Sequence, residues 1–217
     1  EVLPQRTLAY DNLVLAVGSQ TNDFGTKGAA EYCSFLDSRE QADKFHHKLL
    51  NTYLKANNTA SEKGNFELNI AIVGAGATGV ELAAELHNTA SQLAAFGLDQ
   101  LKQDQLKVTI IEAGERILPA LPPRISAAAH RELEKLGIEV KTQTFIQEVT
   151  NEGFVTKDGE TIVAQLKIWA AGVKAPNWMK ELGGLETNRV NQLTVKPTLQ
   201  TTLDDDIFAI GDCSFMI

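Results

Sequence analysis

The stretch from Asn69 to Glu81 constrains the fold of this chain more than any other. It reads NIAIVGAGATGVE, so an apolar run ends abruptly in glycine-rich sequence and a helical pattern follows at once. This order predicts a buried strand, a tight glycine turn and the start of a helix. A dinucleotide-binding fingerprint needs this context, and Gly-x-Gly-x-x-Gly outside it carries little weight.

Each glycine of this turn has an expected physical role. Gly74 permits the tight turn, Gly76 lets a pyrophosphate approach the backbone because it has no Cβ, and Gly79 lets the helix pack closely on the strand. Ala77 and Thr78 open the helix, whose unpaired N–H groups and partial positive charge favour phosphate. The alternative is an ordinary strand-to-helix turn that binds no ligand.

Glu112 directly follows the next expected strand, Val108–Ile111. A carboxylate at this strand end can accept hydrogen bonds from an adenosine ribose, and it would repel a 2′-phosphate, which favours NADH over NADPH. The spacing from the glycine turn is longer than usual, because a long helix and a polar excursion at Asp99–Gln105 come between. An ordinary solvated glutamate in a turn is the alternative.

Strands and helices continue to alternate after Glu112. A helix after Pro123 is expected to bury Ile125, Ala128, Ala129, Leu133 and Leu136, and Ile138–Val140 follows as a third strand. Strand, helix, strand, helix, strand is one mononucleotide-binding half of a doubly wound sheet. Short apolar runs between 142 and 163, with an Asp-Gly turn, predict an antiparallel β-meander.

A further helix is expected before the glycine turn. Asp37 is placed as its N-cap with Glu40 completing a capping box, and the polar segment Asn57–Asn65 is expected to end it in a loop. His46 and His47 are adjacent on this helix and point about 100° apart, so they form no simple metal-binding pair. No metal site is predicted.

Two outer strands lie apart from this nucleotide-binding unit. Leu13–Val17 is followed by Gly18, and Ile207–Ile210 is followed by Gly211 and Asp212. We expect them to belong to a second sheet that the middle domain interrupts, either paired with each other or left with unpaired edges. The predicted fold class is therefore α/β: a Rossmann-like parallel sheet with an antiparallel β-meander, flanked by strands of a second sheet.

Composition excludes several classes of protein. The formal net charge of −8 argues against a nucleic-acid surface and against an anionic-membrane surface made by this segment. Cys33 and Cys213 have neither CxxC nor metal-site spacing, which favours a reducing compartment. The sequence begins at Glu1 and stops in an apolar run, so we expect a soluble fragment of a longer polypeptide.

Five separated segments resemble type II (alternative) NADH:quinone oxidoreductases, which are two-dinucleotide-domain flavoproteins. The resemblance covers nearly the whole chain, and the motifs are specific as an ordered set rather than singly. They are YDNLVLAVGS at 10–19, GAGATGVELA at 74–83, IEAGERILP at 111–119, WAAGV at 169–173 and IFAIGDC at 207–213.

This resemblance implies an outer domain that binds FAD and an inserted domain that binds NADH. NADH would pass hydride to FAD, and two electrons would then reach a membrane quinone. Ala171 and Gly172 would lie near the nicotinamide half of NADH, while Gly18, Gly211 and Asp212 would meet FAD. Glu81 would lie near the flavin and the quinone as a proton relay. The NADH pyrophosphate and ribose would be held by Gly74, Gly76, Ala77, Thr78, Gly79 and Glu112.

The resemblance also sets the expected organisation and partners. Residues 1–30 and 181–217 would be remnants of the FAD-binding domain, and 31–180 the inserted NADH-binding domain. The first glycine motif of the FAD domain would precede Glu1, so stable FAD is not expected in this chain. A segment after Ile217 would attach the protein peripherally to the cytoplasmic side of the inner (plasma) membrane, and a homodimer is left open.

Two alternatives remain on sequence grounds. The chain could derive from another pyridine nucleotide-disulfide reductase-like flavoprotein, such as a disulfide reductase or a ferredoxin-type reductase. It could also be a nucleotide-sensing module without catalysis.

Overall fold

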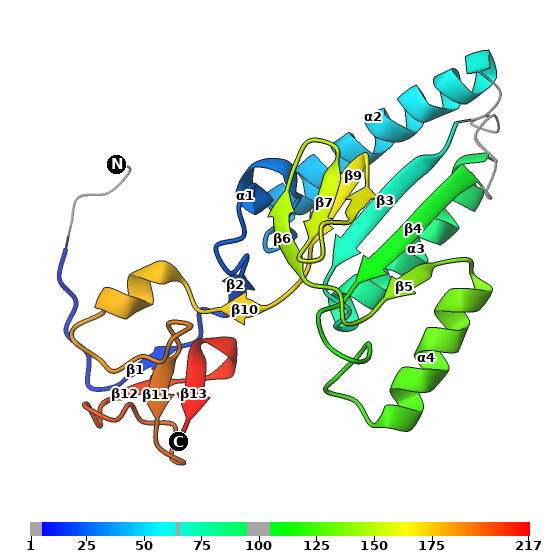
Figure 1. The fold of residues 1–217 in the computed structure, drawn as a ribbon. Coiled ribbons are helices and arrows are strands. Elements are labelled where there is room, and N and C mark those ends of the chain that lie inside the picture. Colours follow the sequence, from blue (N-terminus) through cyan, green and yellow to red (C-terminus); the bar gives the residue numbers. More distant parts are fainter. Residues whose placement is uncertain (1–5, 64–65, 95–104) are drawn as a thin grey trace. The chain divides into compact units, whose positions relative to one another are not determined.

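The computed structural model describes residues 6–63, 66–94 and 105–217, and the chain divides into two compact units (Figure 1). One unit is continuous, from Thr21 to Gly172, and the other combines Glu1–Gln20 with Val173–Ile217. The inserted unit thus has earlier bounds at both ends than the 31–180 expected from the sequence. The expected polar excursion at 99–105 falls outside the described residues apart from Gln105.

A parallel sheet forms the centre of the inserted unit. Its strand order is β5-β4-β3-β9, so β3 lies between β4 and β9. Val73 pairs with Ile111 on one side and with Trp169 on the other, which aligns the carboxyl ends of three strands. The strands are β3 (Leu68–Val73), β4 (Leu106–Ile111), β5 (Glu139–Lys141) and β9 (Leu166–Trp169).

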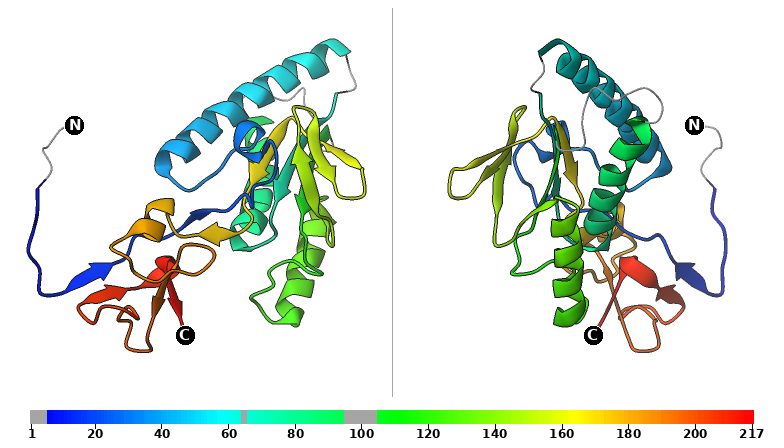
Figure 2. Two further views of the ribbon diagram at one scale, coloured as in Figure 1. Left: turned by 60° about the vertical axis from the view of Figure 1, so that its left-hand side comes forward. Right: turned by 90° about the vertical axis from the view of Figure 1, so that its right-hand side faces the viewer.

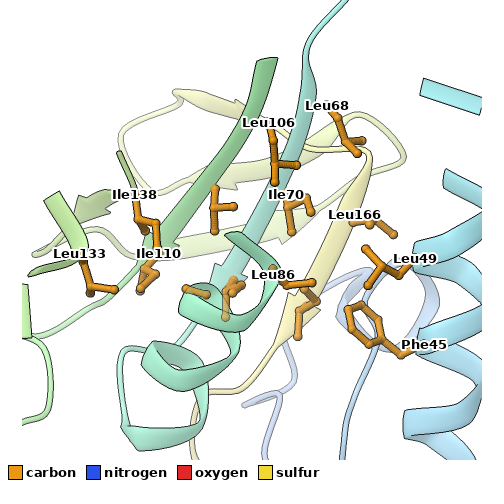
Figure 3. Packing of buried hydrophobic residues seen from close by; sticks show 14 of the residues in the cluster. Phe45, Leu49, Leu68, Ile70, Leu86, Leu106, Ile110, Leu133, Ile138 and Leu166 are labelled. Carbon is orange, nitrogen blue, oxygen red and sulfur yellow. The ribbon is translucent and has the colours of Figure 1, made fainter. Parts of the chain in front are cut away.

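Three helices cover one face of this sheet. Alternate strand residues such as Ile70, Ile110 and Leu166 point toward the helices and are buried with Leu86 of α3 and Leu133 of α4 (Figure 3). The residues of this core come from every second position of the strands and from the apolar stripe of each helix. The helices are α2 (Arg39–Lys63), α3 (Ala77–Ala94) and α4 (Pro123–Lys135).

The expected antiparallel meander is confirmed and covers the opposite face of the sheet (Figure 2). Phe154 of the meander is fully buried against Trp169 and Val73 of the sheet. The short helix α1 (Ala29–Tyr32) precedes this layer in sequence, and its Ala29 joins the same core. The meander strands are β6 (Ile146–Val149), β7 (Gly153–Thr156) and β8 (Thr161–Val163).

Helix α2 starts and ends differently from the sequence prediction. Asp37 is not its N-cap: the Ser38 hydroxyl accepts the Gln41 N–H at 3.2 Å, and Gln41 Oε1 accepts the Asp37 N–H at 2.7 Å. Asp37 instead accepts hydrogen bonds from the backbone and hydroxyl of Thr21. Glu40 pairs with Lys44 on the exposed surface.

The end of α2 lies at Lys63, so the loop expected from Asn57 was wrong. Asn57 is only 6% exposed, beside the buried Tyr53 and Ala56 of the same helix. Asn57 is therefore part of the buried face of α2 rather than the start of a loop. His46 and His47 are exposed.

Helix α4 buries a different first-turn residue from the one predicted. Ile125 is 47% exposed, whereas Ser126 is buried and donates its hydroxyl to the Ile117 carbonyl at 2.7 Å. Leu133 is buried as expected. The turn after the helix has Gly137 at φ +76, which is the left-handed conformation expected after a helix end.

The second unit is built from short strands. The two outer strands predicted from the sequence pair with each other: β1 aligns Leu13 with Ile207 of β12 in a parallel register, which confirms one of the two expectations for them. Its core contains Met179, Leu193, Val195 and other buried residues. Its elements are β1 (Leu13–Leu15), η2 (Asn177–Glu181), β11 (Leu193–Val195), β12 (Ile207–Ala209), η3 (Gly211–Cys213) and β13 (Ser214–Met216). Two-residue strands, β2 (Gln20–Thr21) and β10 (Val173–Lys174), stand where the chain passes between the units.

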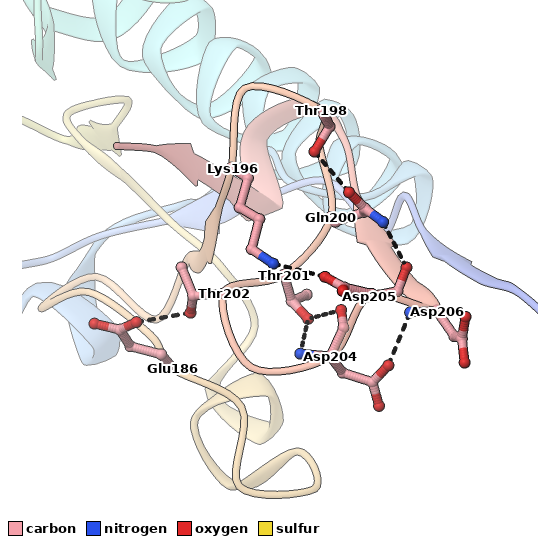
Figure 4. Close-up of polar contacts among 9 residues, drawn as sticks. All are labelled: Glu186, Lys196, Thr198, Gln200, Thr201, Thr202, Asp204, Asp205 and Asp206. Atoms are coloured by element: carbon pink, nitrogen blue, oxygen red, sulfur yellow. Dashed lines mark hydrogen bonds and ion pairs between the residues drawn. The ribbon is translucent and has the colours of Figure 1, made fainter.

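A polar turn closes the connection from β11 to β12 (Figure 4). Lys196 Nζ pairs with Asp205 at 2.6 Å, and the Thr201 hydroxyl donates to the Asp204 carbonyl at 2.8 Å. Gln200 donates to the Asp205 carbonyl at 2.9 Å. Through these bonds, the carboxylate-rich segment 204–206 forms a structural turn.

Candidate functional site: a cavity at the strand ends

A cavity of about 570 Å³ opens at the carboxyl ends of the parallel strands. The Gly74 N–H donates to the Ile111 carbonyl at 2.8 Å, and the Ala170 N–H donates to the Val73 carbonyl at 2.8 Å, so three chain segments meet there. Ligands of open α/β sheets bind at this edge, where the strand order reverses. The lining residues are Phe24, Thr26, Val73, Gly74, Gly76, Ile111, Glu112, Ala113, Pro119, Thr144, Phe145, Ile146, Trp169, Ala170, Ala171 and Gly172.

The glycine turn needs two of its glycines for steric reasons. Gly74 has φ +105, and a Cβ there would lie 2.6 Å from the Ala171 backbone nitrogen. A Cβ on Gly79 would lie 1.9 Å from the Gly74 carbonyl oxygen, so α3 packs directly on the turn. Gly76 faces open space and lines the cavity. The expected tight turn and close helix packing are confirmed.

The helix start lies beside the cavity rather than in its wall. Ala77 is the first residue of α3, and both Ala77 and Thr78 are exposed. The Val80 N–H donates to the Gly76 carbonyl at 3.1 Å, which marks the first helical bond. The N–H groups before it have no partner within the helix, which is the arrangement that attracts anions.

Glu112 ties the end of β4 to the glycine turn. One carboxylate oxygen accepts the Ala75 N–H at 2.8 Å, and the other accepts the Gly114 N–H at 2.7 Å. Two charge-assisted bonds hold the side chain in one orientation at the cavity wall. Because a carboxylate has about four acceptor positions, it can still accept bonds from a ligand hydroxyl.

The ERILP segment forms a braced loop at the cavity. The Arg116 guanidinium donates to the carbonyls of Leu118, Pro119 and Leu121 at 3.3, 2.7 and 2.8 Å. Leu118 has φ +47, and its N–H donates to the Ala75 carbonyl at 2.7 Å. Arg116 thereby fixes the loop that places Pro119 in the cavity wall.

Ala171 and Gly172 line the cavity where β9 ends, and their expected place near the nicotinamide half of NADH stays a prediction. Gly172 has φ +67, and a Cβ there would lie 2.4 Å from Phe24 Cζ. Phe24 comes from the loop between Thr21 and α1, far from Gly172 in sequence. Gly172 is therefore required both by its backbone conformation and by the ring beside it.

Several lining residues were missed from the sequence, notably Phe24, Thr26, Thr144, Phe145 and Trp169. Phe24 lies in an irregular loop, and Phe145 lies between β5 and the meander, so neither stands directly at the end of a strand of the parallel sheet. Only Trp169 carried a sequence signal, because it begins the WAAGV segment.

Glu81 is exposed on α3 and does not line this cavity. Its expected role as a proton relay therefore remains a prediction. Among the residues with described placement, no group of three or more histidine, cysteine, aspartate or glutamate side chains could hold a metal ion. None of the helices within the described ranges is both long enough and apolar enough to span a membrane.

A second cluster of predicted residues lies in the other unit. β1 and β12 are parallel neighbours, so Gly18 and Gly211 follow adjacent strand ends, with φ +67 and +75. The Ser19 hydroxyl donates to Asp212 Oδ2 at 2.8 Å, and Gln192 Nε2 donates to the Asp212 carbonyl at 2.8 Å. An added Cβ on either glycine meets nothing within 4 Å, so this strand edge is open to a ligand.

The parallel sheet, the glycine turn and the paired outer strands define an α/β fold of the dinucleotide-binding type. The chain belongs to the pyridine nucleotide-disulphide oxidoreductase family, whose sequence profile matches residues 3–217.

Comparison with named relatives and with a solved structure shows which members of this family the chain is similar to. The chain is 50% identical to a type II NADH:quinone oxidoreductase of Haemophilus influenzae, over 98% of this chain and 50% of that protein. It is 32% identical to the external alternative NAD(P)H-ubiquinone oxidoreductase B1, mitochondrial, of Arabidopsis thaliana, over 99% of this chain and 39% of that protein. The structure of NDH2 from Plasmodium falciparum in complex with NADH superimposes with a TM-score of 0.80 at 27% identity, over 96% of this chain and 45% of that chain. The chain thus spans half or less of the length of each.

Proposed function

We propose that this chain carries the NADH site of an NADH:quinone oxidoreductase, an enzyme that passes hydride from NADH to FAD and then two electrons to a quinone. The supporting observation is the cavity at the strand ends, which combines the glycine turn, Glu112 and the Ala171–Gly172 backbone. The relatives named above are NADH:quinone or NAD(P)H-ubiquinone oxidoreductases by name, and the related NDH2 structure is a complex with NADH.

In this proposal the glycine turn holds the NADH pyrophosphate. Gly76 leaves its side of the cavity open, and the first N–H groups of α3, at Ala77 and Thr78, donate to phosphate oxygens. Gly74 and Gly79 act on the backbone, because they let the strand end, the turn and the helix approach one another. The turn therefore fits a pyrophosphate without rearrangement.

Glu112 accepts hydroxyl bonds from the adenosine ribose in this arrangement. Its orientation is fixed by the Ala75 and Gly114 N–H groups, so the carboxylate is already in place before binding. A 2′-phosphate at the same position would face this negative charge, which gives the preference for NADH over NADPH.

The nicotinamide half lies at Ala171 and Gly172, where the β9 end leaves the backbone accessible. Hydride transfer between two rings needs little acid–base chemistry from side chains. What the protein supplies is close and dry placement of the reacting atoms, about 3–3.5 Å apart.

FAD fits the strand ends of the other unit. Gly18 and Gly211 leave space for close backbone approach, and Asp212 retains acceptor positions beyond its bond from Ser19. When bound, FAD supplies the hydride acceptor. The role of Asp212 is to accept hydroxyl hydrogen bonds and so orient the group. Residues 1–20 and 173–217 would then contribute to the FAD-binding domain, and 21–172 would be the NADH-binding domain.

Glu81 is proposed to deliver protons for quinone reduction, since its carboxylate is exposed on the first turns of α3. In the complete protein, Glu81→Gln should lower quinone turnover while leaving NADH affinity unchanged. Unchanged turnover in steady-state assays with a soluble quinone would refute this role.

The nucleotide site is tested by titrating the chain with NADH and NADPH and following nucleotide fluorescence. The expected result is tighter binding of NADH. Glu112→Ala should reduce the preference roughly tenfold, because one or two hydrogen bonds to a charged acceptor are lost. Glu115→Ala, at an exposed neighbouring carboxylate, is the matched control and should leave the preference unchanged. Equal affinity of the unaltered chain for both nucleotides would contradict the role of Glu112.

A complete protein purified without flavin absorbance would favour a nucleotide sensor instead.

For the complete enzyme we also propose peripheral attachment to the cytoplasmic side of the inner membrane. A homodimer is left open as its oligomeric state. Release from isolated membranes by high salt or carbonate would support peripheral attachment, and retention through both washes would contradict it.

A further inference from the structure

We propose that Phe24 is a binding residue for the nicotinamide half of the nucleotide, and that Trp169 is a positioning residue that holds it in place. This inference rests on the proposed function of the cavity. Its starting observation is that Phe24, although distant in sequence from every strand end of the parallel sheet, forms part of the cavity wall beside Gly172.

The backbone of Phe24 is held in an uncommon conformation. Its φ is +54, in the left-handed region that residues with a Cβ seldom adopt. Two local bonds maintain it: the Phe24 N–H donates to Asn22 Oδ1 at 3.0 Å, and the Gly25 N–H donates to Asp23 Oδ1 at 3.1 Å. Residues kept in such conformations cluster at binding and active sites.

The loop that carries Phe24 is anchored to the strand ends at the cavity. The Asn22 N–H donates to the Gly172 carbonyl at 3.3 Å, and Trp169 Nε1 donates to the Asn22 carbonyl at 3.1 Å. Trp169 is 3% exposed, so its indole N–H depends on this carbonyl for a partner. The same indole thus packs in the core and fixes the turn that precedes Phe24.

The ring of Phe24 is placed where a planar ligand would lie. It approaches Gly172 so closely that an added Cβ would come within 2.4 Å of Cζ, yet 66% of the residue is exposed. An aromatic ring fixed on one side and open on the other can stack against a ligand ring with little loss of side-chain freedom. Glu112 and Thr144 define another part of the wall, since the Thr144 N–H donates to the Glu112 carbonyl at 3.0 Å.

The test compares two probes, NADH and ADP, by calorimetric titration of the chain. ADP carries the adenosine and pyrophosphate but has no nicotinamide. Phe24→Ala should weaken NADH binding roughly three- to tenfold, the range expected for loss of one aromatic contact, and leave ADP binding unchanged. Trp169→Phe keeps the buried ring but removes the bond to Asn22, and it should shift NADH affinity in the same direction by a smaller factor.

Phe145→Ala provides the matched control, because Phe145 is also a cavity-lining phenylalanine that is 57% exposed, but it follows Thr144 near Glu112. It should weaken NADH and ADP by similar factors. Near-wild-type NADH affinity in Phe24→Ala would overturn the inference, as would equal weakening of both probes, which would indicate general loosening of the unit. Failure of the unaltered chain to bind NADH would instead reject the proposed function itself.

Discussion

At the residue scale, the glycine turn shows how steric demands divide among chemically identical positions. Gly74 and Gly79 have no room for a Cβ, whereas Gly76 faces open space. The first two are therefore needed for the fold of the turn, and the third is free to serve a ligand. Their identical appearance in the fingerprint hides two different physical requirements.

Gly79→Ala should destabilise the chain, because the new Cβ would lie 1.9 Å from the Gly74 carbonyl oxygen and force α3 away from the turn. The expected loss is about 1–3 kcal/mol or more, as in other overpacked sites, and urea unfolding would measure it. Gly76→Ala is the control, with near-normal stability but weaker NADH binding. An unfolding midpoint for Gly79→Ala equal to that of the parent chain would contradict the packing argument.

Cys33 should react slowly with alkylating reagents in the folded chain. Burial raises the pKa of the Cys33 thiol to about 12, although the positive charges of Lys167 and Lys48 oppose this rise. Because only the thiolate reacts, alkylation by iodoacetamide at pH 8 should be on the order of a thousandfold slower than in the unfolded chain. The rate should climb only as the pH approaches the raised pKa.

Mass spectrometry after a timed pulse of iodoacetamide would locate the label and separate Cys33 from Cys213. The same pulse in urea supplies the unfolded reference. Equal labelling of Cys33 in both conditions would show that the thiol ionises as if it were solvated.

At the element scale, the loop after β4 depends on one side chain. Arg116 supplies hydrogen bonds to three carbonyl oxygens within the Leu118–Leu121 segment. Carbonyl groups in irregular backbone have no hydrogen-bond partner from a helix or a sheet. The several N–H donors of one guanidinium can satisfy such carbonyls instead. The loop is consequently a defined wall of the cavity rather than a flexible connection between β4 and α4.

Arg116→Leu should lower the free energy of unfolding by about 1–3 kcal/mol, because charge-assisted bonds are lost and carbonyl groups are left without donors. It should also weaken NADH binding through displacement of Pro119. Urea unfolding and nucleotide titration would measure the two effects. Arg124→Leu, at an exposed position near the start of α4, is the matched control and should change neither quantity. Similar behaviour of the two variants would refute the bracing role.

At the scale of the whole molecule, each unit has cores of its own. Two buried clusters, one against the helices and one against the meander, lie entirely within Thr21–Gly172. The cluster around Met179 and Leu193 lies in the other unit. Since burial of apolar surface dominates folding free energy, a unit with its own core can fold independently.

A polypeptide of residues 21–172 should therefore fold alone and bind NADH with an affinity similar to that of the whole chain. Circular dichroism should show a cooperative thermal transition, and the nucleotide titration should be unchanged within about twofold. The 217-residue chain measured in parallel is the reference. Non-cooperative melting of the shorter polypeptide would show that the flanking segments are needed for its core.

The sequence by itself determined the features that depend on neighbours along the chain. The glycine turn, the meander with its Asp-Gly turn and the order of strands and helices all arise from local backbone preferences and apolar periodicity. It failed where local signals were nearly equal: Ser38 rather than Asp37 caps α2, and Ser126 rather than Ile125 is buried in α4.

Only the tertiary structure decided which distant segments meet. It brought Phe24 against Gly172 and directed both Glu112 oxygens to backbone N–H groups. It also paired β1 with β12, although the whole inserted unit separates these strands in sequence. Contacts of this kind depend on where strands end in space and on which packing buries the most apolar surface. Residue spacing along the chain specifies neither the strand ends nor the packing. The residues that line the cavity could therefore be identified only from the tertiary structure.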